Sequence, residues 1–315
     1  MTADLPDRTA RVFEAAGVRR QVPLAPLTTW HIGGPAEFLL RTAEPERLAA
    51  CRAAAEEAGL PVSFLGRGSN LLVADAGVPG LVLCPLDRDA PVHFDLEHGR
   101  VRASAGVLMP ALARQLALQG FAGLDFLSAI PGSLGGGVVM NAGLSSAARR
   151  ELAHFVDAVT LVGPGGEVRR VGRDALNFDY RTSPFQNGVD CLVEVELQVT
   201  ERAAPADLLA QISALQAERR KRQPLGIRTA GSTFFAAPET GRAAGYFLDQ
   251  VGAKGLAVGD ARVSEIHANW IENTGHATSA DVEALLEQLE TRVRTRFGIM
   301  LRREVRRLPA WPSAA

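Results

Sequence analysis

Two glycine-rich segments constrain the fold of this chain more than any other feature of its sequence. The first reads GRGSN at residues 66–70, and the second reads PGSLGGG at residues 131–137. Glycine costs conformational entropy, so runs of it indicate sharp backbone turns or close approach of another group. Neither segment is a Walker A loop, because no GK[ST] follows it. Neither is the Rossmann pattern either: in the first segment, Leu71 stands where the third glycine would be required.

Both segments nevertheless have the composition of an oxyanion cradle. Consecutive backbone N–H groups without an adjacent Cβ can point into one concavity and bind phosphate oxygens. Either segment alone is equally consistent with a structural turn. As a pair, they favour one extended dinucleotide bound between two subdomains. Side chains that could add hydrogen bonds to such a ligand are those of Ser69, Asn70, Ser133 and Asn141.

The composition is that of an ordinary globular protein. The chain has 315 residues, 47% hydrophobic and 22% charged, which predicts two or three domains. A net charge of −1 gives no basic field for nucleic acid or for an anionic membrane. The N-terminal segment carries acidic residues and no apolar core of a secretory signal. We therefore expect a cytoplasmic protein without nucleic-acid or membrane partners.

Cysteine and histidine spacing argues against a metal site. The three cysteines, Cys51, Cys84 and Cys191, form no CxxC pair and cannot all be paired. They are expected to be small buried side chains in a reducing compartment. The six histidines show no HExxH spacing. We expect no metal.

Periodicity and end signals predict an α+β protein with a change of character near residue 204. Helices are expected at 45–58, 110–119, 206–222 and 281–297. Strands are expected around GRGSN and at 100–107 and 191–200, with a hairpin at 154–171 around Gly-Pro-Gly-Gly. The helix at 206–222 ends in the basic run RRKR. That run either complements the helix dipole or forms an anion site.

Seven segments in a fixed order resemble one known family. They are TTWHIGGPAEFLLR (28–41), FLGRGSNLLVADAGVPGLVL (64–83), GLDFLSAIPGSLGGGVVMNAG (123–143), DYRTSPF (179–185), AGSTFF (230–235), VSEIHANWIENTGHATSADV (263–282) and LRREVR (301–306). Together they resemble the UDP-N-acetylenolpyruvoylglucosamine reductases, the MurB flavoproteins, from about residue 20 to residue 307.

The resemblance implies a fold and a division into domains. It implies an FAD-binding module of the p-cresol-methylhydroxylase type at 23–203, with subdomains at about 23–88 and 89–203. A separate α+β substrate domain is expected at 204–307. Residues 1–22 would be an N-terminal extension, and residues 308–315 a disordered tail.

The resemblance also implies non-covalent FAD, with NADPH as co-substrate. Both glycine loops would contact FAD, through Gly66, Arg67, Gly68, Ser69, Asn70, Leu71, Pro131, Gly132, Ser133, Gly135, Gly136, Asn141, Ala142 and Gly143. The segment 30–34 would lie near the cofactor too. For Trp30 and His31, core packing is the alternative.

Three polar residues occupy the family's catalytic motifs. Taken alone, Arg181 could be a salt-bridging arginine, Ser232 a turn residue and Glu304 a surface charge. By resemblance, Arg181 engages the substrate carboxylate and the catalytic glutamate, for which a planar guanidinium is suited. Ser232 would be the proton donor, although composition alone does not distinguish it from Thr233. Glu304 would lie in the substrate pocket, either paired through Arg181 or acting on the intermediate.

The implied reaction is the NADPH-dependent, FAD-mediated reduction of UDP-N-acetylenolpyruvoylglucosamine to UDP-N-acetylmuramate, in peptidoglycan precursor synthesis. A hydride would pass from the flavin to C3 of the enolpyruvyl group, and Ser232 would protonate C2. A monomer or weak oligomer is expected.

The chain departs from the family pattern after AGSTFF. Many members carry Lys and Asn where this chain has Ala236 and Ala237. Another cation must then hold the UDP diphosphate, with Lys254, Arg228 or the 219–222 run as candidates. Tyr180 and Asn269 are further candidate substrate contacts. The chain has only two tyrosines and a short segment from Arg181 to Ser232, which places it in the shorter branch without a Tyr-bearing loop.

Two alternatives remain open at this point. A flavin oxidase of the same superfamily would need a covalent tether, for which His31 is the obvious candidate, and would leave Ser232 and Glu304 without a role. A nucleotide-binding protein that has lost catalysis would be expected to lack the three catalytic residues.

Overall fold

The computed structural model describes residues 5–86, 90–144, 150–223, 226–235 and 240–310. The chain divides into two compact units, each assembled from separated segments. The first unit comprises 1–20, 38–67 and 79–219, and the second comprises 21–37, 68–78 and 220–315. Both glycine loops begin in the first unit, and the first loop continues into the second at Gly68. None of the helices in the described ranges is long and apolar enough to span a membrane.

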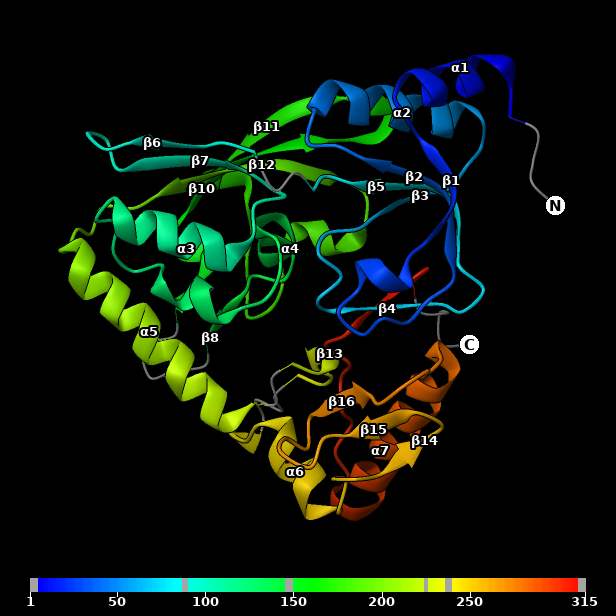
Figure 1. Ribbon diagram of the computed structural model, residues 1–315, viewed down its shortest axis with the longest axis vertical. Helices are drawn as coiled ribbons and strands as arrows, with labels where there is room; N and C mark the ends of the chain where they lie inside the picture. Colours follow the sequence, from blue (N-terminus) through cyan, green and yellow to red (C-terminus); the bar gives the residue numbers. More distant parts are fainter. Residues whose placement is uncertain (1–4, 87–89, 145–149, 224–225, 236–239, 311–315) are drawn as a thin grey trace. The chain divides into compact units, whose positions relative to one another are not determined.

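A four-stranded sheet contains the N-terminal strands. Its order is β1 (Arg19–Pro23), β2 (Pro35–Arg41), β5 (Val78–Cys84) and β3 (Val62–Phe64), with β3 and β5 parallel. The helices α1 (Asp7–Ala15) and α2 (Pro45–Glu57) pack with it in Figure 1. Pro45 at the first turn and Gly59 just past the end bound α2, as expected from the sequence. Phe13 of α1 stacks edge-on against Phe38, so the segment expected as an extension carries core residues.

A five-stranded antiparallel sheet forms the rest of the first unit. Its order is β11 (Val168–Gly172), β10 (Val156–Val162), β12 (Cys191–Gln198), β7 (Arg100–Ser104) and β6 (Val92–Asp95). Along β12, Val193, Val195 and Leu197 are buried and the glutamates between them are half-buried, which confirms the predicted alternation. The predicted hairpin is confirmed as β10 and β11, joined by the 3-10 turn η4 (Pro164–Gly166).

Helices cover one face of this sheet (Figure 1). They are α3 (Met109–Leu118) and α5 (Pro205–Arg222), and both predicted helices are confirmed to within one residue at each end. The basic run is the last turn of α5, and burial lowers the pKa of Arg219. The shorter elements are α4 (Leu134–Val139), β8 (Gly143–Leu144), β9 (Arg150–Glu151), η2 (Asp125–Ala129), η3 (Leu152–His154), η5 (Arg173–Ala175) and η6 (Pro184–Asn187).

The second unit is a four-stranded antiparallel sheet with two helices. The strand order is β13 (Arg228–Ser232), β16 (Trp270–Asn273), β15 (Ala261–Val263) and β14 (Ala257–Val258), and the helices are α6 (Ala244–Gln250) and α7 (Ser279–Phe297). A capping box from Thr278 begins α7, and Gly298 in the left-handed region ends it. Of the predicted α7 face, five aliphatic side chains are fully buried, whereas Phe297 at the end is 36% exposed.

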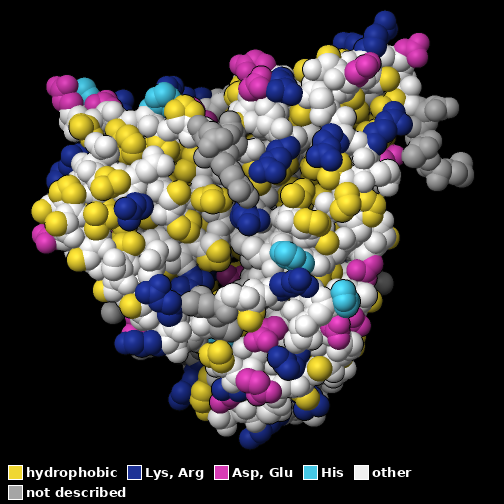
Figure 2. All heavy atoms as spheres, in the orientation of Figure 1, with side chains coloured by type: hydrophobic (Ala, Val, Ile, Leu, Met, Phe, Trp, Pro, Cys, Tyr) yellow, Lys and Arg dark blue, Asp and Glu magenta, His cyan; other side chains and the backbone are white. Residues whose placement is uncertain are grey.

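The C-terminal strand returns to the start of the second unit. β17 (Arg306–Leu308) pairs in parallel with β4 (Leu71–Val73), the strand that follows the first glycine loop. The 3-10 turn η1 (Ala25–Leu27) follows β1 directly in the sequence. Leu308, at the start of the expected tail, is buried in β17, and residues 311–315 lie outside the described residues. On the face drawn in Figure 2, acidic and basic side chains are interspersed over the α6 and α7 region.

The predicted burial of the three cysteines is confirmed. Burial raises the pKa of the Cys51 and Cys84 thiols to about 11 and that of Cys191 to about 12, from an ordinary value of 9.0. At pH 8 the native thiols should therefore react with Ellman's reagent far more slowly than those of urea-unfolded protein. Above pH 9 the unfolded thiols lose protons first, so the urea midpoint should fall as pH rises from 9 to 11. Fast labelling of native protein at pH 8 would contradict this burial.

Candidate active site

The two glycine loops adjoin within the first unit. A Cβ built on Gly66 would lie only 2.8 Å from Oγ of Ser133, so no side chain fits there without displacing that hydroxyl. Ser133 is the N-cap of α4, and its Oγ accepts a hydrogen bond from the N–H of Gly136 at 3.3 Å. The geometry thus brings together the two segments that the sequence singled out as one cradle.

The glycines of the second loop have different physical causes. A Cβ on Gly135 would meet Cβ of Ala105 at 2.7 Å, and one on Gly137 would meet Sδ of Met109 at 2.6 Å. These two glycines are required by core packing. Gly136 is exposed, and its nearest outside neighbour is the Ser133 hydroxyl at 3.3 Å. Gly136 is therefore a position of this loop where no side chain covers the surface, although its N–H is bonded to Ser133.

The first loop is fixed at its second-unit end. Gly68 has φ +64°, and a Cβ there would lie 2.6 Å from the carbonyl oxygen of Leu27. Both the conformation and the close backbone approach require glycine. Further along, Asn70 donates from Nδ2 to the carbonyl oxygen of Glu304 at 3.1 Å and accepts from the N–H of Arg306 at 3.1 Å. The loop is thereby tied to the C-terminal strand.

Trp30 and His31 differ in their surroundings. Trp30 is fully buried, and its Nε1 donates to the carbonyl oxygen of Ile271 at 2.8 Å. Core packing, one of the two alternatives for Trp30, is what the structure shows. His31 is exposed and has φ +57°, a conformation that costs energy for a residue with a Cβ.

Asn141 is a buried hydrogen-bonding centre. Its Nδ2 donates to Oε2 of Glu151 at 3.0 Å and to the carbonyl oxygen of Asp179 at 2.9 Å, and its Oδ1 accepts from the N–H of Ala153 at 3.0 Å. Both side-chain N–H groups are thus used within the protein. Asn141 links the second glycine loop to the segment that carries Arg181. Its predicted contact with the cofactor remains a prediction.

Arg181 is held against the end of the second loop. Its Nη1 donates to the carbonyl oxygen of Asn141 at 3.2 Å, and its Nη2 donates to that of Gly143 at 2.6 Å. The guanidinium carbon lies 5.4 Å from the ring centre of Tyr180. Arg181 has φ +52°, so the backbone stores strain at this position. The first unit therefore gathers Tyr180, Arg181 and the segment 141–143.

Ser232 and Thr233 lie in different environments. Thr233 is buried, and its Oγ1 donates to the carbonyl oxygen of Asn269 at 3.2 Å and to Oδ1 of Asn269 at 3.1 Å. Ser232 is half-buried at the end of β13, and its hydroxyl makes no hydrogen bond to any residue in the described ranges. Of the two adjacent hydroxyls in these described residues, that of Thr233 is engaged with Asn269 and that of Ser232 is not bonded.

Asn269 holds this segment in place. Its Oδ1 accepts from the N–H of Phe234 at 3.0 Å, and its Nδ2 donates to the carbonyl oxygen of Phe234 at 2.9 Å. Its own N–H donates to Nδ1 of His267 at 3.2 Å. Burial, and then the charge of Lys254, lower the pKa of His267, which favours the neutral ring that this bond requires. In this arrangement Asn269 positions the Ser232 strand, and its predicted contact with the substrate remains a prediction.

Replacing Asn269 should uncouple stability from cofactor binding. In Asn269→Ala, buried polar groups of Thr233 and Phe234 lose their partners, which should cost about 1–3 kcal/mol of unfolding free energy. The variant should retain bound flavin, whereas reduction of the substrate should slow because Ser232 is no longer held. Urea unfolding and flavin absorbance measure these effects. Asn177→Ala, at an exposed position, is the matched control. Unchanged stability in Asn269→Ala would contradict the assignment.

The backbone of Glu304 is bonded to Thr233, the residue that follows Ser232, and to Asn70. The N–H of Glu304 donates to the carbonyl oxygen of Thr233 at 2.8 Å, and its carbonyl oxygen accepts from Asn70. Its side chain is half-buried. Asn70 and Glu304 are 234 residues apart in the sequence. The second unit nevertheless brings these two residues and the segment of Ser232 together.

The candidate diphosphate ligands are dispersed. Lys254 is 39% exposed, and its Nζ lies 3.2 Å from Oδ1 of Asp249. Arg228 lines a pocket at the opposite end of β13 from Ser232. Ala236 and Ala237, which replace the family's Lys and Asn, lie outside the described residues.

These features fit FAD in three respects. The close approach of Gly66 to Ser133 forms a cradle that a side chain would fill, Gly136 is exposed beside it, and the first loop is bonded through Asn70 to the segment carrying Glu304. Gly66, Ser133 and Gly136 would lie against the pyrophosphate. The fold and site define the class of two-part, FAD-dependent oxidoreductases with a separate C-terminal domain.

Comparison with known proteins identifies the family. Residues 36–172 match the FAD binding domain model, and residues 223–308 match the C-terminal domain of UDP-N-acetylenolpyruvoylglucosamine reductase. The chain is 38% identical to that reductase from Synechococcus elongatus over 291 residues, covering 92% of this chain and 94% of the relative. It is 40% identical to the one from Heliobacterium modesticaldum over 289 residues, covering 91% and 89%. The crystal structure of the Thermus caldophilus reductase, MurB, superposes with a TM-score of 0.75 at 32% identity, covering 93% of this chain and all of that chain.

The chain belongs to the UDP-N-acetylenolpyruvoylglucosamine reductase family. The expected fold class, an α+β FAD-binding module followed by a separate α+β domain, is confirmed, as are the predicted family and cofactor.

Proposed function

We propose that the protein uses NADPH to reduce the enolpyruvyl group of UDP-N-acetylenolpyruvoylglucosamine, giving UDP-N-acetylmuramate for peptidoglycan synthesis in the cytoplasm. The observation that carries this proposal is the half-buried Ser232, whose hydroxyl bonds to none of the described residues, next to Thr233, whose hydroxyl is bonded to Asn269 and whose backbone is bonded to Glu304. When bound, FAD supplies the hydride, taken from NADPH, that adds to C3 of the enolpyruvyl group.

The chain's own residues manage charge and protons. As C3 gains hydride, negative charge develops on C2 and the substrate carboxylate. Ser232 holds a proton on Oγ that it delivers to C2, a task suited to a weak acid that does not titrate near neutral pH. Arg181 offers a planar guanidinium to the substrate carboxylate. Glu304 lies in the substrate pocket and acts with Arg181 on the enolic state, where electrostatic stabilisation is the large contribution.

The proposal extends to domain roles. Residues 23–203 form the FAD-binding module, with subdomains at about 23–88 and 89–203, and residues 204–307 bind the substrate. No tyrosine occurs between Arg181 and Ser232, which supports membership of the shorter branch. The protein acts as a monomer or weak oligomer.

The flavin itself reports on this function. The purified protein should be yellow. Under anaerobic conditions NADPH should bleach the flavin, and the enolpyruvyl sugar nucleotide should then restore the colour. UDP-N-acetylglucosamine, which lacks the enolpyruvyl group, is the control and should leave the reduced protein bleached. A reduced protein that responds to neither sugar would contradict the substrate, and would favour the alternative of a flavin oxidase.

A further inference from the structure

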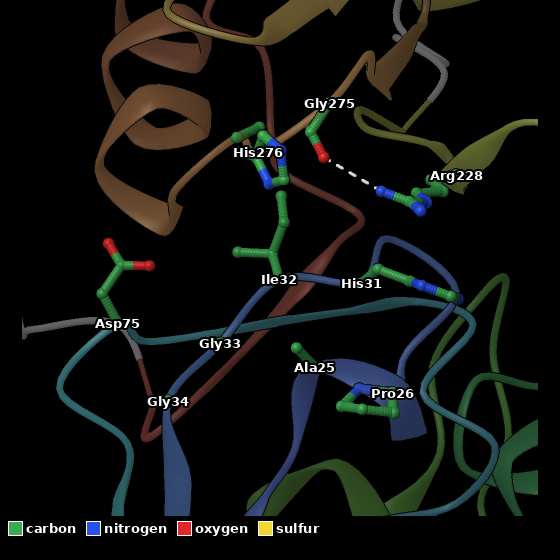
Figure 3. Close-up of a pocket in the computed structure, with 11 residues that line it drawn as sticks. Ala25, Pro26, His31, Ile32, Gly33, Gly34, Asp75, Arg228, Gly275 and His276 are labelled. Carbon is green, nitrogen blue, oxygen red and sulfur yellow. Dashed lines mark hydrogen bonds between the residues drawn. The ribbon is translucent and has the colours of Figure 1, made fainter.

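The second unit contains a pocket that holds none of the three proposed catalytic residues. Its volume is about 410 Å³, and it is lined on one side by Ala25, Pro26 and Ile32. His31, Arg228 and His276 come to it from three separate segments of the chain, as Figure 3 shows. Arg228 begins β13 and Ser232 ends it, so the rise of a strand separates the two Cα atoms by about 13 Å. The pocket is distinct from the catalytic hydroxyl.

The charge of Arg228 is not neutralised by an acidic partner. Its Nη1 donates to the carbonyl oxygen of Gly275 at 2.9 Å (Figure 3), and no carboxylate of the described residues pairs with it. Other arginines of this unit are paired within 3.5 Å: Arg262 with Glu272, Arg303 with Glu290 and Arg307 with Glu283. Arg228 keeps N–H donors of its guanidinium for a ligand.

The nearby acids are committed to the backbone. Asp75 accepts from the N–H of Ser279 at 2.8 Å, from its Oγ at 2.8 Å and from the N–H of Ala280 at 3.2 Å, which caps the start of α7. Asp260 accepts from the N–H of His276 at 2.7 Å. Each carboxylate is therefore directed to helix or backbone N–H groups, and neither of them pairs with Arg228.

The wall that carries His31 is rigid. A Cβ on Gly34 would lie 2.2 Å from the carbonyl oxygen of Asp75, and one on Gly33 would lie 2.4 Å from Cβ of Val73. His31 itself is held at φ +57°. A non-glycine residue in this conformation is kept only where its surroundings enforce it, which is a common property of binding sites. The pocket is therefore largely pre-formed.

We propose that this pocket binds a phosphoryl group, with Arg228 as its anchor and His31 and His276 as flanking donors. The apolar wall accommodates the organic part of a phosphorylated small molecule. The phosphoryl group comes either from a separate phosphorylated metabolite or from a substrate of the reaction, and only the second source rests on the proposed function.

Phosphate binding to the flavin-loaded protein tests the site without turnover. Inorganic phosphate, followed by ³¹P NMR line broadening, should bind saturably, and Arg228→Gln should weaken binding at least tenfold. Arg292→Gln removes the same charge from an exposed position of α7 and should bind as the wild type does. His276→Gln should weaken phosphate binding as well. It replaces Arg228→Gln as the test variant if Arg228→Gln fails to retain flavin. Equal binding by the wild type, Arg228→Gln and His276→Gln would overturn the proposal.

Steady-state kinetics then identify the source. A KM for the sugar nucleotide or for NADPH that rises tenfold in Arg228→Gln, but not in Arg292→Gln, would assign the phosphoryl group to that substrate. Unchanged KM values together with lost phosphate binding would assign it to a separate metabolite. Because the NMR measurement needs no catalysis, failure of the proposed reaction would leave the binding result intact.

Discussion

Ser232→Ala should slow reduction of the enolpyruvyl sugar by about a hundredfold to ten thousandfold, the usual contribution of a positioned general acid. Bleaching of the flavin by NADPH should remain near the wild-type rate, because that half-reaction needs no proton at C2. Stability should change little, since the Ser232 hydroxyl bonds to no other residue in the described ranges. Stopped-flow absorbance of the flavin measures the two half-reactions separately.

Thr233→Val is the matched control for the proton donor. It also removes one hydroxyl, but that hydroxyl is buried and bonded to Asn269. It should cost about 1–3 kcal/mol of stability and leave proton donation largely intact. If both half-reactions slowed equally in Ser232→Ala, or if Thr233→Val alone lost the sugar half-reaction, the proton donor would not be Ser232.

Glu304→Gln should slow the same half-reaction by about a hundredfold to a thousandfold, the range found when one preorganised electrostatic contact is removed. Glutamine keeps the shape of the side chain, and the backbone of residue 304 remains bonded to Thr233 and to Asn70. The loss would therefore report on the carboxylate itself rather than on a displaced strand. Transient kinetics with a fixed amount of reduced flavin would measure it.

The control for this variant is Glu283→Gln. Glu283 of α7 pairs with Arg307 of β17 at 2.7 Å, and its replacement should affect neither half-reaction. The substrate KM of Glu304→Gln should change less than kcat if the carboxylate acts on the developing charge. A variant with normal kcat and a raised KM would instead make Glu304 a ground-state binding residue.

Local signals in the sequence were sufficient for most secondary structure. Pro45 and Gly59 bound α2, and the alternation along β12 matches its buried face. The apolar spacing of α7 predicted its core contacts, except at Phe297, where the helix end leaves the ring partly in solvent beside Phe247. The helix α1 was not predicted, although its nine residues are strongly amphipathic and bury Thr9 and Phe13.

The catalytic motifs were found by resemblance, but their supports were not. The sequence suggests Asn269 as a substrate contact, and only the folded chain shows that its side chain bonds to Thr233 and Phe234. The pocket lined by Arg228 likewise depends on three segments brought together by β13, β16 and the loop before β2. No spacing within one segment encodes either arrangement.

The sequence by itself determined the family, the cofactor class, the secondary structure and the two glycine loops, because these depend on local backbone preferences and on motifs of contiguous residues. Only the tertiary structure decided why each glycine is present: Gly135 and Gly137 serve packing, Gly66 serves the approach of Ser133, and Gly136 stays open. It also distinguished Ser232 from Thr233. Such roles depend on which distant atoms come within 3–4 Å, and that is settled only when the chain packs.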